Sequence, residues 1–327
     1  MNKQIIQFKK QIENGQLAQS FLVIGPERTG KFSTVIKMIG ILNDLSDREL
    51  KLVRRGELAD IILLQTINSE IGKEKVKNVI KQKATKNPDK RGENKRNKKK
   101  IGGDVISKRQ LDKAIRTIGL KNFQLFKKVL IIRDADKLTH TATNSLLKLI
   151  EEPQKDLVIF LLVNNEDDVL ATIKSRCQKI NFFIQDSKQI EEVLNVEFNL
   201  TDEILNKIVK LSGGRIDLAR NYAQNIKKID LAFKARDEFR KSLMAGKIEQ
   251  FKLVDKIIAS EDDLLWILNE WIWYLKDFLE QNIQKNNDRL ILKRIYVILN
   301  QLLKTRGLIK TTNVNKKIQL ENFFVQI

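Results

Sequence analysis

The segment GPERTGKFS near the N-terminus contains the residue types that bind phosphate. Gly25, Gly30 and Lys31 match the pattern G-x-x-x-x-G-K-[ST], whose loop amides surround phosphates and whose lysine reaches the terminal ones. Phe32 takes the place of the hydroxyl that should bind Mg²⁺, and a phenyl ring cannot ligate a metal. Ser33 comes one residue later, about 100° further around a helix. Two alternatives follow: the loop binds ATP weakly without hydrolysis, or it keeps its shape for packing alone.

A second altered position follows the apolar run at residues 129–132, which ends in Arg133 and Asp134. In enzymes that hydrolyse nucleoside triphosphates, an acidic residue here holds Mg²⁺ and another orients the attacking water. Arg133 would repel the metal, and Asp134 is a poorly placed substitute for the missing carboxylate. Because the loop also lacks its hydroxyl, we predict no metal site and no intrinsic ATP hydrolysis.

Two further polar residues stand at positions that a nucleotide-handling fold uses. Asn164 follows the apolar run at residues 157–163, where a sensor of the γ-phosphate would lie; a plain turn is the alternative. Arg176, in the segment ATIKSRC, offers a planar and permanently charged set of donors. Such a guanidinium stabilises the charge that develops on a γ-phosphate. Without its context, Arg176 would be an ordinary surface arginine.

Apolar strands and amphipathic helices alternate around these residues. Short apolar runs bounded by turn residues predict buried parallel strands at 20–24, 60–64, 129–132 and 157–163. Helical spacing predicts helices at 4–14, at 106–118 and after Thr139, whose hydroxyl can cap the last of them. This order of elements predicts an α/β fold with a parallel sheet.

Composition limits the size and class of the protein. The chain has 327 residues, 42% of them hydrophobic, and only 3 Pro, which predicts two or three helix-rich domains. Because His140 is the only histidine, catalysis by a Ser/His/Asp or Cys/His arrangement has almost nothing to draw on. A single cysteine, Cys177, excludes an intrachain disulfide and a multi-cysteine zinc site. No apolar stretch approaches the roughly 20 residues that a membrane span needs. We therefore expect a cytoplasmic protein that contacts no membrane.

The formal net charge of +20 predicts a polyanionic partner. Residues 81–100, KQKATKNPDKRGENKRNKKK, contain much of this charge and no large apolar side chain. Such a run cannot bury a core. It is either a solvated insertion or a loop that contacts DNA, and the lack of interleaved aromatic residues weakens the second alternative.

Four segments in order resemble the bacterial clamp-loader family of AAA+ proteins, within it the delta-prime subunits of DNA polymerase III. They are GPERTGK, ADKLTHTATNSLLKLIEEP, NNEDDVLATIKSRC and LSGGRIDLAR, and they cover roughly residues 1–225. EWIWYLKDFL is similar to a tryptophan-rich helix in the family's C-terminal domain. The resemblance implies an AAA+ core with a RecA-like parallel sheet, a small helical lid and an all-α collar. The three domains are expected at 1–185, with a Lys-rich insertion at about 81–103, then 186–227 and 228–327.

The resemblance also implies a function in DNA replication. In this family the SRC arginine projects into the ATP site of a neighbouring subunit, which assigns Arg176 as a trans arginine finger. The implied partners are the gamma/tau and delta clamp-loader subunits in a hetero-oligomer, with the sliding clamp and primer-template DNA reached through the complex. Gly25, Gly30, Lys31, Asp134 and Asn164 would then form a degenerate nucleotide site, with ATP as its only candidate cofactor and without hydrolysis.

This chain departs from the active members of the family. Ile216 or Asp217 stands where the lid of an active subunit has a second sensor arginine, and the four cysteines of a zinc module are missing. These losses are expected of a largely non-catalytic subunit. An ATP-hydrolysing gamma/tau-type motor is the alternative, if Lys31 and Asp134 suffice. A free-standing basic DNA-binding adaptor is a third interpretation, and it rests on the charge alone.

Overall fold

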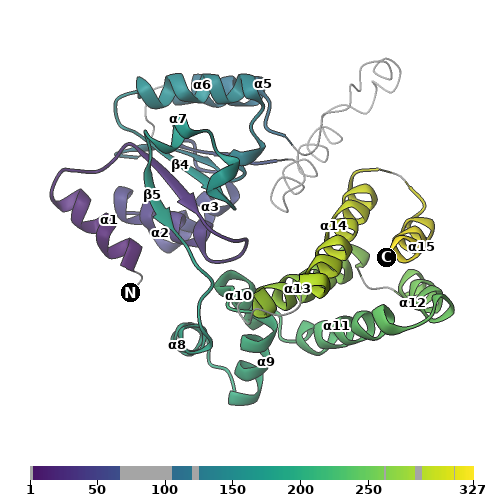
Figure 1. The fold of residues 1–327 in the computed structure, drawn as a ribbon. Helices are drawn as coiled ribbons and strands as arrows, with labels where there is room; N and C mark the ends of the chain where they lie inside the picture. The colour runs from purple at the N-terminus through teal and green to yellow at the C-terminus, as the bar shows by residue number, and fades with distance from the viewer. Residues whose placement is uncertain (1–2, 67–104, 120–124, 261–262, 284–288, 313) are drawn as a thin grey trace, which may run out of the picture. The chain divides into compact units, whose positions relative to one another are not determined.

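The computed structural model describes residues 3–66, 105–119, 125–260, 263–283, 289–312 and 314–327 (Figure 1). The Lys-rich insertion predicted at about 81–103 lies outside these ranges. The chain divides into two compact units. The first contains residues 1–185 and 215–217, and the second contains residues 186–214 and 218–327. The predicted division into core, lid and collar stays a prediction.

A parallel five-stranded sheet forms the centre of the first unit, in the order β2-β3-β4-β1-β5. The strands are β1 (Ser20–Ile24), β2 (Ile61–Leu64), β3 (Lys128–Ile132), β4 (Leu157–Val163) and β5 (Gln178–Asn181). Every residue of β1, β3 and β4 is buried, because helices cover both faces of the sheet. Uninterrupted apolar runs such as LVIFLLV are typical of strands in this environment. The predicted α/β class with a parallel sheet is confirmed.

Two hydrophobic cores lie on the two faces of this sheet. One face packs against α1 (Lys3–Glu13), α2 (Lys31–Asn43) and α3 (Asp47–Arg55). The other packs against α5 (Lys108–Ile118), α6 (His140–Glu151) and α7 (Ala171–Lys174), and short 3-10 turns η1 (Ala135–Lys137) and η2 (Glu166–Asp168) follow β3 and β4. The helices start where side chains cap them: Ser46 in α3, Ser107 in α5 and, as predicted, Thr139 in α6.

The second unit is entirely helical within the described ranges. Its helices are α8 (Ser187–Glu197), α9 (Asp202–Ser212), α10 (Ile216–Gln224), α11 (Lys228–Met244), α12 (Lys247–Ala259), α13 (Leu264–Ile283), α14 (Arg289–Thr311) and α15 (Lys316–Gln326); the first two residues of α10 belong to the first unit. Gly213 and Gly214 have positive φ angles of 52° and 74°, a conformation that ends α9. None of the helices in the described part of the chain combines the length and apolar character that a membrane crossing requires.

The hydrophobic core of the second unit is built around Trp271 of α13, which is fully buried. Its ring stacks on Phe239 of α11 at a centroid distance of 4.4 Å, and its Nε1 donates a hydrogen bond of 3.1 Å to the Ala235 carbonyl. An indole whose N–H is satisfied in this way can be buried without an unpaired polar group. Trp271 of the tryptophan-rich helix is therefore a core residue of the second unit.

Candidate functional site

The Lys31 side chain is directed at oxygen atoms of its own unit. Its Nζ donates to the carbonyl of Gly25, to the carbonyls of Pro26 at 3.1 Å and Val163 at 3.0 Å, and to Asn164 Oδ1 at 2.9 Å. The side chain is buried, and burial lowers the pKa of Lys31 from 10.5 to about 8. The structure thus brings the predicted lysine and the predicted sensor asparagine together. The ammonium group has three hydrogens, and acceptors within the protein are available for all of them.

Packing alone accounts for both glycines of the loop. A Cβ on Gly25 would lie 2.3 Å from the Phe182 carbonyl oxygen, and a Cβ on Gly30 would lie 2.9 Å from Ile216 Cγ2. Gly30 also has a φ of 94°, a backbone angle that residues other than glycine rarely adopt. The shape of the loop therefore needs glycine at these positions whether or not a phosphate binds. Ile216, one of the two residues that could stand in place of the sensor arginine, lies against Gly30 of this loop.

The two altered positions of the metal site contact each other. The guanidinium carbon of Arg133 lies 4.3 Å from the centroid of the Phe32 ring, a cation–π arrangement. Arg133 Nη1 also donates to Gln65 Oε1 at 3.3 Å. The carboxylate of Asp134 accepts from the backbone N–H of Thr66 at 3.2 Å and from its hydroxyl at 3.0 Å. A ring and a cation therefore stand where Mg²⁺ would need a hydroxyl and a carboxylate, and these residues do not fit the metal.

An acidic side chain lies at the N-terminal turn of α2. Ser33 Oγ is 2.7 Å from Asp217 Oδ1, and the Asp217 N–H donates to the Arg28 carbonyl at 2.9 Å. The N-terminal end of a helix is the usual place for a bound phosphate, because its free N–H groups and dipole attract anions. Here Asp217 places a carboxylate of the protein beside that end. From the sequence, Asp217 was only one of two candidates for the position of the missing sensor arginine, and its contact with Ser33 was not predicted.

These contacts do not fit a Mg²⁺–ATP complex. The lysine is satisfied by carbonyl oxygens, the helix end has its own carboxylate, and the metal position holds an aromatic ring beside an arginine. Across the described ranges, no group of three or more His, Cys, Asp and Glu side chains could hold a metal ion. The geometry supports a loop that is held closed by the protein itself.

Arg176 follows α7 and forms a separate cluster. Its Nε lies 3.0 Å from Glu151 Oε1, and its Nη1 donates to the Thr172 carbonyl at 3.1 Å and to Ser175 Oγ at 3.2 Å. The side chain is 42% exposed. Among the described residues, no recorded hydrogen bond or ion pair joins it to the glycine loop. Cys177 is buried, and burial raises the pKa of its thiol to about 11, as expected of a cysteine that serves packing alone.

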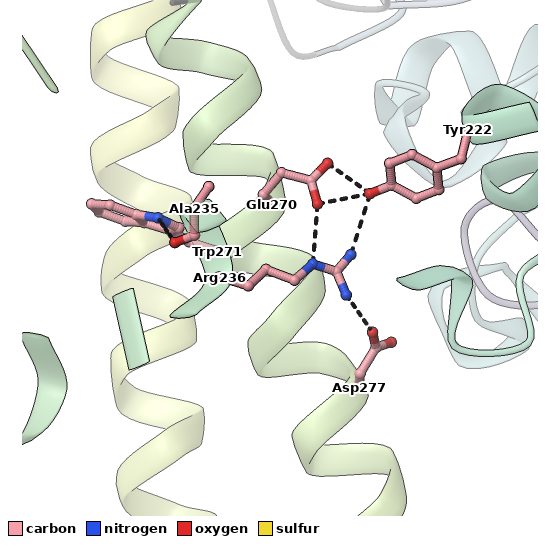
Figure 2. Close-up of polar contacts among 6 residues, drawn as sticks. All are labelled: Tyr222, Ala235, Arg236, Glu270, Trp271 and Asp277. Carbon is pink, nitrogen blue, oxygen red and sulfur yellow. Dashed lines mark hydrogen bonds and ion pairs between the residues drawn. The ribbon is translucent and has the colours of Figure 1, made fainter. Parts of the chain in front are cut away.

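Sequence reasoning missed a buried polar cluster in the second unit (Figure 2). Arg236 of α11 donates to Glu270 Oε2 at 3.0 Å and to Asp277 Oδ2 at 3.3 Å, both on α13. The Tyr222 hydroxyl of α10 lies 2.7 and 2.8 Å from the two carboxylate oxygens of Glu270. All four side chains are buried. A weak signal was available, because Glu270 and Asp277 are seven residues apart and share a face of an otherwise apolar helix.

The comparisons with known proteins define the class of this chain. Residues 1–186, more than half of the chain, match the model of the family described as "DNA polymerase III, delta subunit". The chain therefore belongs to this family. It is similar to the delta-prime subunits of DNA polymerase III, as the motifs predicted, and its parallel sheet and helical C-terminal region agree with the predicted AAA+ class.

Curated relatives are similar over part of their length. The chain is 32% identical to DNA polymerase III subunit delta′ of Bacillus subtilis over 122 residues, which are 36% of this chain and 37% of the relative. It is 33% identical to the subunit delta′ of Escherichia coli over 88 residues, 27% of this chain and 26% of the relative. The alignments thus span little more than a third of these relatives at most.

The comparison with solved structures found a match to a DNA polymerase III gamma-subunit-related protein of Thermotoga maritima. It is 14% identical to this chain with a TM-score of 0.45, and the alignment covers 99% of this chain and 98% of that protein.

Proposed function

We propose that this chain is the delta-prime subunit of a DNA polymerase III clamp loader and is itself largely non-catalytic. It donates Arg176 in trans to the ATP site of a neighbouring subunit while the loader places a sliding clamp on DNA during replication. The observation that carries this proposal is a contrast within one unit: the glycine loop is closed on itself, whereas Arg176 stays exposed.

The loss of intrinsic hydrolysis follows from charge and metal chemistry. Hydrolysis of ATP by P-loop enzymes requires Mg²⁺ held near the β- and γ-phosphates. Phe32 supplies no oxygen ligand, and the guanidinium of Arg133 on that ring repels a cation. The alternative, a gamma/tau-type motor, would need Asp134 to support the metal, but its carboxylate accepts two hydrogen bonds from Thr66.

The proposed finger has the chemistry that the role requires. Arginine stays protonated under all physiological conditions and presents its donors in a fixed plane. Arg176 lies in the turn between α7 and β5, and its neighbours Ile173 and Cys177 are anchored in the core. An exposed cationic side chain on a backbone that is held in place is suited to contact a group of another chain.

The proposed partners follow from the family and the relatives' names. We expect a hetero-oligomer with the gamma/tau and delta subunits, in which the clamp and primer-template DNA are reached through the complex. The expected location is the cytoplasm, without a membrane partner. A role of the Lys-rich insertion in DNA binding stays a hypothesis, since that segment lies outside the described residues.

The test is ATP hydrolysis by the loader reconstituted from the subunits of one organism, stimulated by clamp and primed DNA. Arg176→Ala is expected to slow hydrolysis at the site it serves by about 10³-fold, the lower range for an arginine finger. Arg116→Ala, at an exposed arginine of α5, is the matched control and should leave turnover unchanged. Unchanged turnover with Arg176→Ala would overturn the proposal, and hydrolysis by the isolated chain would support the motor alternative.

A further inference from the structure

Two side chains next to core residues form the exposed ion pair at Arg176. Glu151, the last residue of α6, follows Ile150, which is 8% exposed, and Arg176 precedes Cys177, which is also 8% exposed. Ile150 and Cys177 belong to the same hydrophobic core. The backbones that carry the carboxylate and the guanidinium are therefore held in fixed places, although both side chains reach solvent.

The contacts of Arg176 use one part of its guanidinium. The Glu151 carboxylate forms an ion pair at Nε, while the Thr172 carbonyl and Ser175 Oγ accept hydrogen bonds from Nη1. For Nη2, no hydrogen bond to any described residue is recorded. A guanidinium has five N–H donors in a plane, so fixing Nε and Nη1 sets the direction in which the Nη2 donors point.

The position of Glu151 is unfavourable for its own helix. The C-terminal end of a helix carries partial negative charge and favours cations, yet α6 ends in Glu151 and is followed by Glu152. A carboxylate at this place needs another reason, and the pairing of Glu151 with Arg176 provides one. Glu152 has the same charge and is exposed, and no ion pair with it is recorded among the described residues.

We propose that Glu151 is a positioning residue for the arginine finger, an inference that rests on the proposed function. A free arginine side chain samples many rotamers and must give them up when it contacts the γ-phosphate. Glu151 restricts the side chain beforehand, so more of the Nη2 encounters with the neighbour's nucleotide are productive. Glu151 does not itself touch the nucleotide, and it acts only through Arg176.

The experiment is the same reconstituted hydrolysis assay with Glu151→Ala. We expect kcat to fall about three- to tenfold, part of the rotamer restriction of an arginine, while KM for ATP stays unchanged. Glu151→Gln keeps the size of the side chain but removes the negative charge of the ion pair, so kcat should fall as it does with Glu151→Ala. Glu152→Ala is the matched control and should have no effect. An exposed ion pair adds little to folding stability, so all three variants are expected to fold and assemble.

A double variant separates this inference from the proposed function. In the Arg176→Ala background, Glu151→Ala should cause no further loss, because its effect passes through the missing guanidinium. An additional loss there, or a kcat for Glu151→Ala that equals or exceeds that of the wild type, would overturn the positioning role alone. If Arg176→Ala itself leaves turnover unchanged, the proposed function fails and the inference fails with it.

Discussion

Lys31 in the first unit and Arg236 in the second are both buried cations, but their surroundings shift their pKa values in opposite directions. Lys31 and Arg236 are each 8% exposed. Lys31 is surrounded by neutral carbonyl and amide oxygens, and burial lowers its pKa to about 8. Burial also disfavours the charge of Arg236, but Tyr222, Glu270 and Asp277 outweigh burial and raise its pKa. The charge of Arg236 is thus compensated by acidic partners, whereas the ammonium group of Lys31 only donates hydrogen bonds to neutral oxygens.

This difference distinguishes a structural ion from the remnant of a ligand site. A buried cation with carboxylate partners cannot be removed without leaving those partners uncompensated. Glu27, Asp134 and Asp136 raise the pKa of Lys31 by charge attraction, which does not outweigh the effect of burial. A phosphate would complete such a lysine, and here three backbone carbonyls contact it instead. The comparison predicts that the fold depends strongly on Arg236 and weakly on the charge of Lys31.

The largest effect is expected from Arg236→Met, which leaves Glu270 and Asp277 buried without a cation. We expect the free energy of unfolding to fall by about 3–5 kcal/mol. Urea unfolding followed by tryptophan fluorescence measures this in the correct unit, because Trp266, Trp271 and Trp273 all belong to the second one.

The control for this variant is Arg240→Met on the same helix. Arg240 is exposed and paired only with Asp237 among the contacts recorded for it, so no measurable change is expected. Equal stabilities for Arg236→Met and the wild type would remove the distinction between the two cations.

A smaller effect is expected from Tyr222→Phe, which keeps the ring and removes the hydroxyl. Burial first, and then the charge of Glu270, raise the pKa of Tyr222, so the phenol stays protonated and donates to the carboxylate. Loss of one donor to a buried charged group should destabilise the second unit by about 1–3 kcal/mol in the same assay. Tyr274→Phe on α13 is the control, since no hydrogen bond joins that hydroxyl to any residue that the structure describes. Similar losses in both variants would show that ring packing, and not the polar cluster, is being measured.

The elements that could be predicted from the sequence are those whose local signals agree. The runs at 20–24 and 157–163 coincide with β1 and β4, because both strands are buried on both faces and are apolar throughout. The edge strand β5 was not predicted. Its burial alternates, and its sequence QKIN resembles a turn more than a strand. On α6, Leu149 is buried, whereas Leu147 is only partly buried and packs at the margin of the core.

The polar sites show where sequence reasoning ends. Lys31 and Asn164 could be assigned to one site because the ends of parallel strands meet at one edge of a sheet. The contact between Phe32 and Arg133 joins two segments whose alterations were recognised separately. The cluster of Arg236 and Glu270 was not predicted, since the spacing of Glu270 and Asp277 is a weak signal and charged residues in helices are mostly exposed. Only the packing of α11 against α13 shows that these two are buried.

The smallest effect is a pH dependence that sharpens the contrast between the cations. Lys31 has a pKa of about 8 in the folded chain against an ordinary value of 10.5, so between these values the unfolded chain holds a proton that the native chain lacks. Unfolding then takes up a proton, and native stability rises with pH. Between pH 7 and pH 9, the free energy of unfolding of the wild type should rise by about 1 kcal/mol more than that of Lys31→Met. Urea unfolding followed by circular dichroism measures the difference, from which groups common to both chains, such as Cys177, cancel.

The same variant connects this pH dependence with function. If the Lys31 charge is a remnant, Lys31→Met should leave clamp loading by the reconstituted complex nearly unchanged at neutral pH, while Arg176→Ala reduces it. A large loss of loading with Lys31→Met would show that the loop binds nucleotide in the assembled loader, and the passive role proposed for this subunit would have to be abandoned. A stability difference that does not change with pH would instead show that Lys31 titrates like an exposed lysine, although its side chain is buried.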